Sequence, residues 1–141
     1  MLDIRRIREN AAAIKARLAL RGAAASAAAD ELLAADADWR ASLQRYESLQ
    51  AEKNRISKEI GARKKAGESA EAPMARSGEL SAELDAAKKD TETREAAVRD
   101  LALRTPNPPH ESVPPGATAE DNAEVARWGE PPRLPFAPRD H

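Results

Sequence analysis

The chain has 141 residues and a formal net charge of −1, with 33% charged, 41% hydrophobic and only 3% aromatic residues. So few large side chains cannot fill a broad core, and the composition instead favours long helices with narrow contact seams. No cysteine is present, which excludes disulfides, thiolate nucleophiles and cysteine-based zinc sites. The near-neutral charge argues against nonspecific nucleic-acid binding by the whole chain, although it permits a local basic patch.

No apolar run approaches the roughly 20 residues that a transmembrane helix needs. The N-terminus also lacks the apolar region of a signal peptide. We therefore expect a cytoplasmic protein that does not associate with a membrane. The two histidines, His110 and His141, are far apart and have no metal-ligand spacing around them. Both are interpreted as structural residues, and no metal site is expected.

Residues 1–29 predict short helices. Asp3 is a plausible N-cap for a helix over residues 2–10, and Asn10 can cap a second helix that ends near Leu20. Arg21-Gly22 is typical of a helix C-terminus. Residues 23–29 are alanine-rich and have little to pack, so we interpret them as a connection, helical or not. The apolar residues expected to pack these helices are Leu2, Ile4, Ile7, Ile14 and Leu18.

A heptad pattern extends over residues 30–104 and predicts a coiled-coil hairpin of two long antiparallel helices. Asp30 is expected to cap the first helix, and residues 66–72 form the tip. Either the second helix begins near Pro73, or a separate turn precedes it. Each helix has roughly 35 residues and is about 52 Å long. The expected seam positions are Leu32, Ala35, Trp39, Ser42, Tyr46, Leu49, Lys53, Ile56 and Ile60 in the first helix, and Ser77, Leu80, Leu84, Ala87, Thr91, Arg94, Val98 and Leu101 in the second.

The charges on the two helices differ. Residues 53–65 carry six basic residues and one acid, a net charge of +5, whereas residues 79–95 carry six acids and three bases, a net charge of −3. The distal end of the first helix is therefore basic, which is the local patch that the near-neutral total permits. A basic helix end can supply phosphate contacts, but such charges on a helix can equally serve only to keep it solvated.

Residues 105–141 contain nine of the ten prolines and predict an extended segment that ends the second helix. One interpretation is a disordered linker. The other is an extended segment that packs on a core, in which residues 122–129 form a short strand. The apolar residues that would anchor the segment are Val113, Val125, Trp128, Leu134 and Phe136.

In order along the chain, several motifs together resemble the N-terminal region of bacterial seryl-tRNA synthetase over essentially all 141 residues. Each motif is weak alone, and the order and spacing of the set make the resemblance specific. The motifs are Asp3-Ile4-Arg5, Arg8-Glu9-Asn10, Arg21-Gly22, Glu52-Lys53-Asn54-Arg55-Ile56-Ser57-Lys58-Glu59-Ile60-Gly61, Pro106-Asn107-Pro108-Pro109-His110-Glu111-Ser112-Val113-Pro114-Pro115-Gly116, Glu120-Asp121-Asn122, Arg127-Trp128-Gly129-Glu130-Pro131-Pro132 and Phe136-Ala137-Pro138-Arg139-Asp140-His141.

The resemblance implies an all-α tRNA-binding arm that lies against the long variable arm and elbow of serine tRNA. It implies a homodimeric parent enzyme whose class II catalytic domain uses ATP and magnesium and lies beyond His141, so the chain alone is expected to have no cofactor, to be non-catalytic and to be monomeric. The basic residues that we expect to contact tRNA are Arg55, Lys58, Arg63, Lys64, Lys65 and Arg76.

Two other functions are open from the sequence alone. One is a non-catalytic adaptor that binds another protein through apolar residues such as Trp39 and Tyr46. The other is retained aminoacylation chemistry, which the absence of an ATP-site motif or an activated nucleophile makes the weakest of the three hypotheses. Salt discriminates RNA binding from the adaptor, since phosphate contacts weaken steeply as salt rises.

Overall fold

The computed structural model describes residues 3–130, 133 and 135–137, so Leu2, Leu134 and His141 lie outside the described residues. The chain divides into two units, residues 1–109 and 110–141. Within the described ranges there are helices and no strand, which confirms the all-α prediction. The first unit contains α1 (Ile4–Glu9), α2 (Ala11–Ala19), α3 (Ala23–Ala66) and α4 (Glu71–Arg104), and the second contains the short 3₁₀ helix η1 (Ala119–Asp121).

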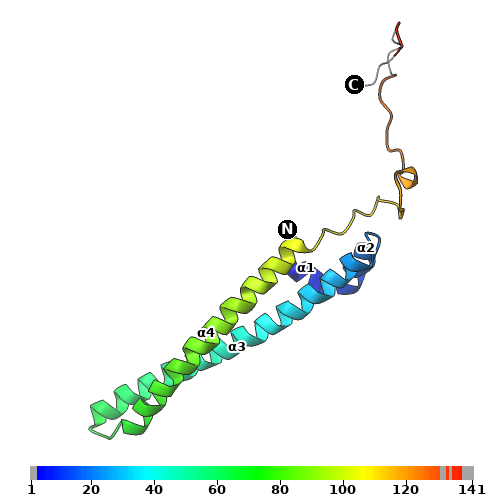
Figure 1. Ribbon diagram of the computed structural model, residues 1–141. Helices are drawn as coiled ribbons and strands as arrows, with labels where there is room; N and C mark the ends of the chain where they lie inside the picture. Colours follow the sequence, from blue (N-terminus) through cyan, green and yellow to red (C-terminus); the bar gives the residue numbers. More distant parts are fainter. Residues whose placement is uncertain (1–2, 131–132, 134, 138–141) are drawn as a thin grey trace. The chain divides into compact units, whose positions relative to one another are not determined.

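Helices α3 and α4 lie side by side and antiparallel, which confirms the predicted hairpin (Figure 1). They have 44 and 34 residues, which correspond to about 66 Å and 51 Å. Helix α3 begins at Ala23, so the prediction that Asp30 caps it was wrong. The reason is packing: Leu18 of α2 is buried against Ala25 and Ala29 of α3. The alanine-rich stretch therefore has the packing partner that its sequence did not reveal.

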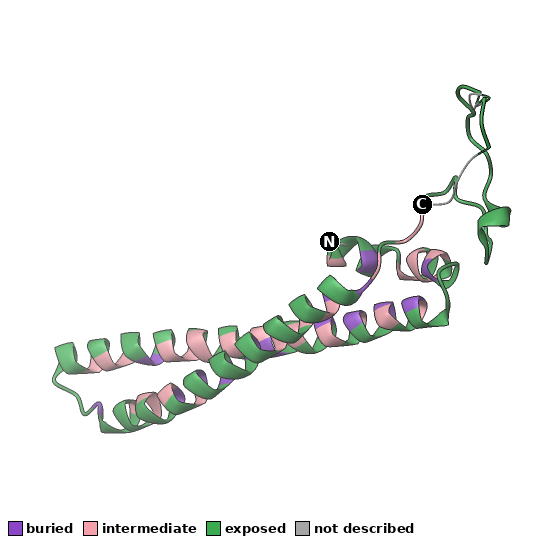
Figure 2. Ribbon diagram, turned by 45° about the horizontal axis from the view of Figure 1, so that its top comes forward, coloured by how far each residue is buried: buried purple, intermediate pink, exposed green. Residues whose placement is uncertain are grey.

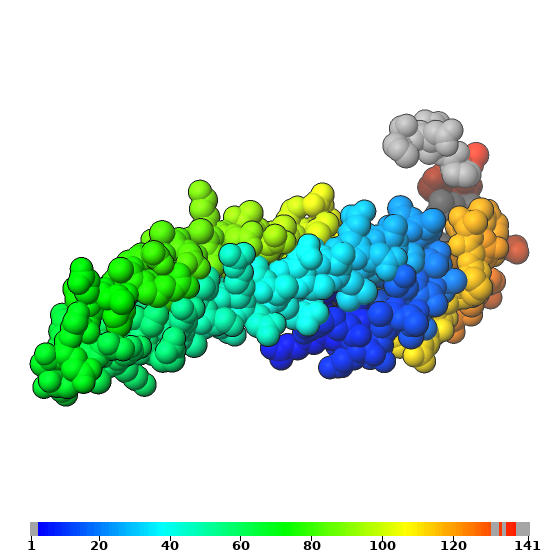
Figure 3. Space-filling model, turned by 90° about the horizontal axis from the view of Figure 1, so that it is seen from below, coloured from blue at the N-terminus to red at the C-terminus, as the bar shows by residue number. Residues whose placement is uncertain are grey.

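The seam of the hairpin follows the predicted heptads. Every predicted seam residue is buried or half-buried, and the buried face of each helix faces the other helix (Figure 2). The polar seam residues make specific bonds: Lys53 Nζ donates to Ser81 Oγ at 3.0 Å, and Thr91 Oγ1 donates to the Ala87 carbonyl oxygen at 2.9 Å. The two helices are packed against each other along the arm (Figure 3). Lys53 and Thr91 are thus both hydrogen-bonded within the hairpin.

The base of the arm is thickened by α1 and α2. Ile7, Leu32 and Ala102 form a buried cluster that joins α1, α3 and α4. Asp3 caps α1 as predicted, since its Oδ1 accepts from the Arg5 N–H at 2.9 Å. Asn10 occupies the N-cap position of α2 but its side chain makes no capping hydrogen bond, so only its position was predicted correctly.

The tip is a tight turn between α3 and α4. Gly67 has φ 75°, in the left-handed region, and the Glu68 N–H donates to the Arg63 carbonyl oxygen at 2.9 Å. Helix α4 begins at Glu71, which places Pro73 in its first turn, where a missing N–H removes no intrahelical bond. Of the two alternatives for this region, the structure has the first, a second helix that begins near Pro73.

The second unit is extended, apart from a turn around η1. The carboxylate of Asp121 accepts from the N–H groups of Ala117 and Thr118 at 2.8 and 3.0 Å, and these bonds hold the pKa of Asp121 below its usual value. A Cβ on Gly116 would lie 2.3 Å from the Asp121 Cβ, so this turn requires glycine.

Two predictions for the second unit were wrong. Residues 122–129 form no strand, because a strand needs a neighbouring strand to share its hydrogen bonds and none lies among the described residues. The proposed anchors do not pack either: Val125 and Trp128 are 96% and 97% exposed. Val113 and Phe136 are also exposed.

Candidate nucleic-acid interface

The distal part of α3 presents a group of exposed cations. Arg55, Lys58, Lys64 and Lys65 are all exposed. Within the part of the chain that the structure describes, none of the four takes part in an ion pair or a side-chain hydrogen bond. Their charges are therefore available to a partner from solution.

Helix geometry sets the arrangement of these cations. At 3.6 residues per turn, Arg55, Lys58 and Lys65 lie within about 80° of one another on the side of α3 that faces away from α4, along about 15 Å of the helix. Lys64 points more toward one flank of the hairpin. The sequence prediction grouped the four by position along the chain, and the fold separates three outward residues from one flanking residue.

Arg63 is engaged within its own helix. Its Nε donates to Glu59 Oε1 at 3.0 Å, its second terminal nitrogen lies 2.9 Å from the same oxygen, and its side chain is half-buried at a position that continues the seam. A phosphate would have to compete with Glu59 for this guanidinium group. Arg63 is thus less available than its neighbours Lys64 and Lys65.

Arg76 joins the two helices near the tip. Its guanidinium group contacts Glu83 at 2.8 Å, Glu79 at 3.2 Å and Glu52 of α3 at 3.2 Å. The hydrogen bonds that Arg76 donates to Glu83 and Glu79, with a smaller contribution from Glu52, hold the pKa of Arg76 above its usual value. Three carboxylates around one cation leave a negative local charge, which disfavours binding of a phosphate. Because one of the three, Glu52, belongs to α3, Arg76 instead links the two helices of the hairpin.

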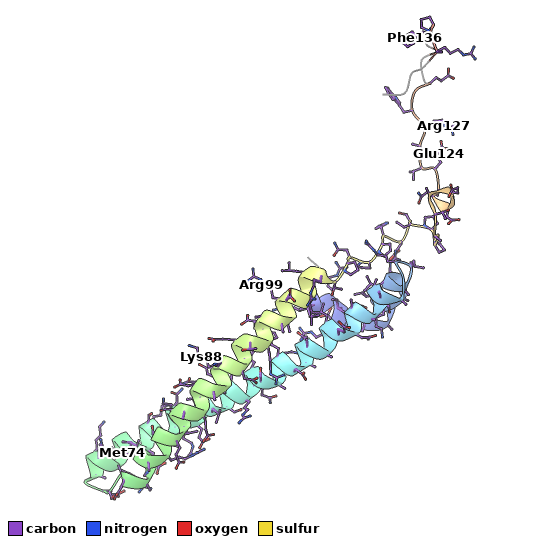
Figure 4. All side chains as sticks on the ribbon, in the orientation of Figure 1. Met74, Lys88, Arg99, Glu124, Arg127 and Phe136 are labelled. Atoms are coloured by element: carbon purple, nitrogen blue, oxygen red, sulfur yellow. The ribbon has the colours of Figure 1, made fainter. Side chains whose placement is uncertain are left out.

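Helix α4 carries charges of both signs on its exposed surface. Asp90 pairs with Arg94 at 3.0 Å, and Lys88 lies 3.9 Å from Glu92. Lys88 and Arg99 extend into solvent from α4 (Figure 4). Acids and bases are interspersed on α4. This helix therefore has no counterpart of the basic surface that Arg55, Lys58, Lys64 and Lys65 form on α3.

The arrangement suits binding to phosphates. Lysine ammonium groups are compact point charges with three donors, and arginine can bind a phosphate through two parallel hydrogen bonds. Among the described residues, no three His, Asp or Glu side chains are grouped in a way that could hold a metal ion. No described helix is long and apolar enough to cross a membrane.

Comparisons with known proteins agree with this geometry. The serine–tRNA ligase of Paracoccus denitrificans is 44% identical over 149 residues, which cover the whole of this chain and 33% of that protein. The serine–tRNA ligase of Burkholderia thailandensis is 41% identical over 141 residues, which cover the whole chain and 32% of that protein. The chain thus spans about a third of the length of these relatives.

A solved structure shows the same fold. The seryl-tRNA synthetase from Pyrococcus horikoshii, whose structure was determined in complex with ATP, superposes with a TM-score of 0.81 and 35% sequence identity, over 92% of this chain and 29% of that one. Residues 1–109 match the family described as Seryl-tRNA synthetase N-terminal domain. Since this match covers the two short helices and the entire arm, the chain belongs to the seryl-tRNA synthetase N-terminal domain family.

Proposed function

We propose that this chain is the tRNA-binding arm of a seryl-tRNA synthetase. In this proposal the hairpin lies against the long variable arm and elbow of serine tRNA, and it positions the acceptor end for serylation by a class II catalytic domain elsewhere in the protein. The observation that carries the proposal is the group of exposed, unpaired cations on the distal part of α3: Arg55, Lys58, Lys64 and Lys65.

The physical chemistry favours recognition of shape. Contacts to phosphates fix the position and orientation of a nucleic acid but carry no sequence information. Double-stranded RNA is recognised mostly through its shape, phosphates and 2′-hydroxyl groups. The aromatic residues of the arm, Trp39 and Tyr46, are half-buried in the seam and offer no stacking platform for unpaired bases. A rigid hairpin with a basic outer face therefore fits a long RNA stem better than a single strand.

In this proposal the chain acts by binding alone. Its partners are serine tRNA and the catalytic domain of the whole protein, which would use ATP and magnesium and would form a homodimer. Serine activation then requires that catalytic domain. Serine-dependent pyrophosphate exchange by the purified 141-residue chain would contradict this part of the proposal.

The decisive experiment compares two RNAs. The chain should bind serine tRNA more tightly than the same tRNA from which the variable arm has been deleted, and its affinity should fall steeply as salt rises. Equal affinity for the two RNAs would refute recognition of the variable arm. A different outcome would be no binding to either RNA, together with salt-independent binding to a protein partner. That outcome would support the adaptor function, which the sequence suggests through Trp39 and Tyr46.

A further inference from the structure

A glycine inside α3 lies at the centre of the basic surface. Gly61 is exposed, and its φ is not in the left-handed region. Apart from its chain neighbours and the adjoining helix backbone, no atom lies within 4 Å of the position that a Cβ would take. The backbone therefore accepts any side chain here, and glycine in a helix interior costs about 1 kcal/mol relative to alanine. Neither the fold nor the packing of this chain requires glycine at this position.

The surroundings of Gly61 are unusual in charge. Residues three and four positions away are its neighbours on the helix surface, with Cβ atoms about 5–6 Å apart. Of these four neighbours, three are exposed lysines and the fourth is a serine: Lys58, Lys64, Lys65 and Ser57. The nearest acid, Glu59, is half-buried and paired with Arg63. Gly61 thus leaves a bare patch of helix backbone inside a ring of ammonium groups.

We infer that this ring, formed by Lys58, Lys64 and Lys65 around Gly61, binds a phosphate of the RNA backbone in direct contact with the helix. The inference rests on the proposed function and gives the binding surface its centre. A phosphate at this place reaches three cations at once, and it can approach closely only because no side chain stands between it and the helix. Gly61 is in this view a contact position for the RNA backbone, and its cost in helix stability is offset by that contact.

A glycine on α4 provides a matched control. Gly78 is also exposed inside a helix, and again no atom beyond its chain neighbours and the adjoining helix backbone lies within 4 Å of its Cβ position. Its four surface neighbours are uncharged: Met74, Ala75, Ser81 and Ala82. Gly61→Gln and Gly78→Gln therefore make the same chemical change in the same kind of backbone, and only the first places a side chain inside a ring of lysines.

Both variants should melt at a higher temperature than the wild type, because glutamine is a far better helix former than glycine. Gly61→Gln should nevertheless bind serine tRNA about tenfold more weakly, the loss expected when a charge-assisted contact is displaced. Gly78→Gln should bind as the wild type does. The cost of Gly61→Gln should also shrink when Lys58, Lys64 and Lys65 are all replaced by glutamine, since residues that share one contact are not additive.

Four results would overturn the inference. Wild-type affinity of Gly61→Gln would show that no phosphate approaches the helix there, and the proposed function would stand if the wild type still preferred the tRNA with its variable arm. Equal weakening by Gly78→Gln would attribute the effect to the altered helices. An unchanged cost of Gly61→Gln without the lysines would separate the glycine from the ring. Failure of the wild-type chain to bind serine tRNA would overturn the proposed function and this site with it.

Discussion

Removing two cations from the outer face of α3 should flatten the salt dependence of tRNA binding. Arg55→Gln/Lys58→Gln alters two exposed side chains that make no ion pair among the described residues. Glutamine forms helices nearly as well as the residues it replaces, so the arm should stay folded. The matched control is Lys89→Gln/Arg99→Gln, which removes one lysine and one arginine, both exposed, from the outer surface of α4.

The size of the effect follows from the number of charges. Each lost phosphate contact lowers the slope of log affinity against log salt by about 0.7–0.9. Two contacts lower it by about 1.4–1.8, so over a fourfold rise in salt the wild type should lose about 7- to 12-fold more affinity than the α3 variant. The α4 control should keep the wild-type slope, because its two cations lie away from the proposed contact surface.

Fluorescence anisotropy of labelled serine tRNA, measured at several salt concentrations, gives the slopes directly, and circular dichroism checks the helix content of each variant. If both double variants lowered the slope equally, the arm would be a nonspecific electrostatic surface. If neither did, the contact surface would have to lie elsewhere on the chain. Either result refutes the assignment of the interface to the outer face of α3.

Three further predictions concern stability. Gly67→Ala should lower the melting temperature seen by circular dichroism, since alanine at φ 75° costs about 1–2 kcal/mol, and an unchanged melting temperature would contradict this. Leu32→Ala should cost about 2–5 kcal/mol in denaturant unfolding, because Leu32 is fully buried between α1 and α4, whereas a cost near zero would mean that the cluster does not hold the base. The turn at residues 117–121 should persist at neutral pH and loosen in acid. The carboxylate of Asp121 has a lowered pKa in the folded chain. The hydrogen bonds that it accepts from Thr118 and Ala117 are therefore fully present above the ordinary pKa of an aspartate, and they are lost as pH falls through the lowered pKa. Amide chemical shifts of Ala117 that do not move with pH would refute this.

The hairpin could be predicted because its determinants are local and periodic. Leu32, Ile56, Leu80 and Leu84 recur at heptad spacing, and the break at residues 66–72 leaves no room for another element between the helices. The same pattern placed polar residues such as Lys53 and Thr91 in the seam, where the structure finds them half-buried or buried. Periodicity alone was sufficient here, because the heptad position of a residue decides whether its side chain points toward the other helix or toward solvent.

Errors arose where the structure of a segment depends on a packing partner outside that segment. The start of α3 was missed because Ala25 and Ala29 look featureless until Leu18 is packed against them. The alternation in residues 122–129 suggested a strand, but a strand requires a neighbour for its backbone groups, and the described residues provide none. The exposed Trp128 was misread for the same reason, since an aromatic residue in a sequence does not reveal what it packs against.

The exposed cations of α3 lie in the stretch that the sequence indicated, but two of the six expected residues, Arg63 and Arg76, are engaged in ion pairs. The cause is how charges distribute around a helix. A net charge of +5 over residues 53–65 already subtracts Glu59, but it counts Lys53, which is half-buried in the seam and donates to Ser81. It also leaves out Glu52, which lies one residue before this stretch and pairs with Arg76. Both glutamates directly precede seam positions, so they lie on the same flank of α3, where each meets an arginine. Within residues 52–65 the acids are thereby held on one flank, and the opposite and outward surfaces of this stretch keep only lysines, one arginine and neutral residues. The basic surface is therefore produced by where the fold places the acids, which no count along the chain can reveal.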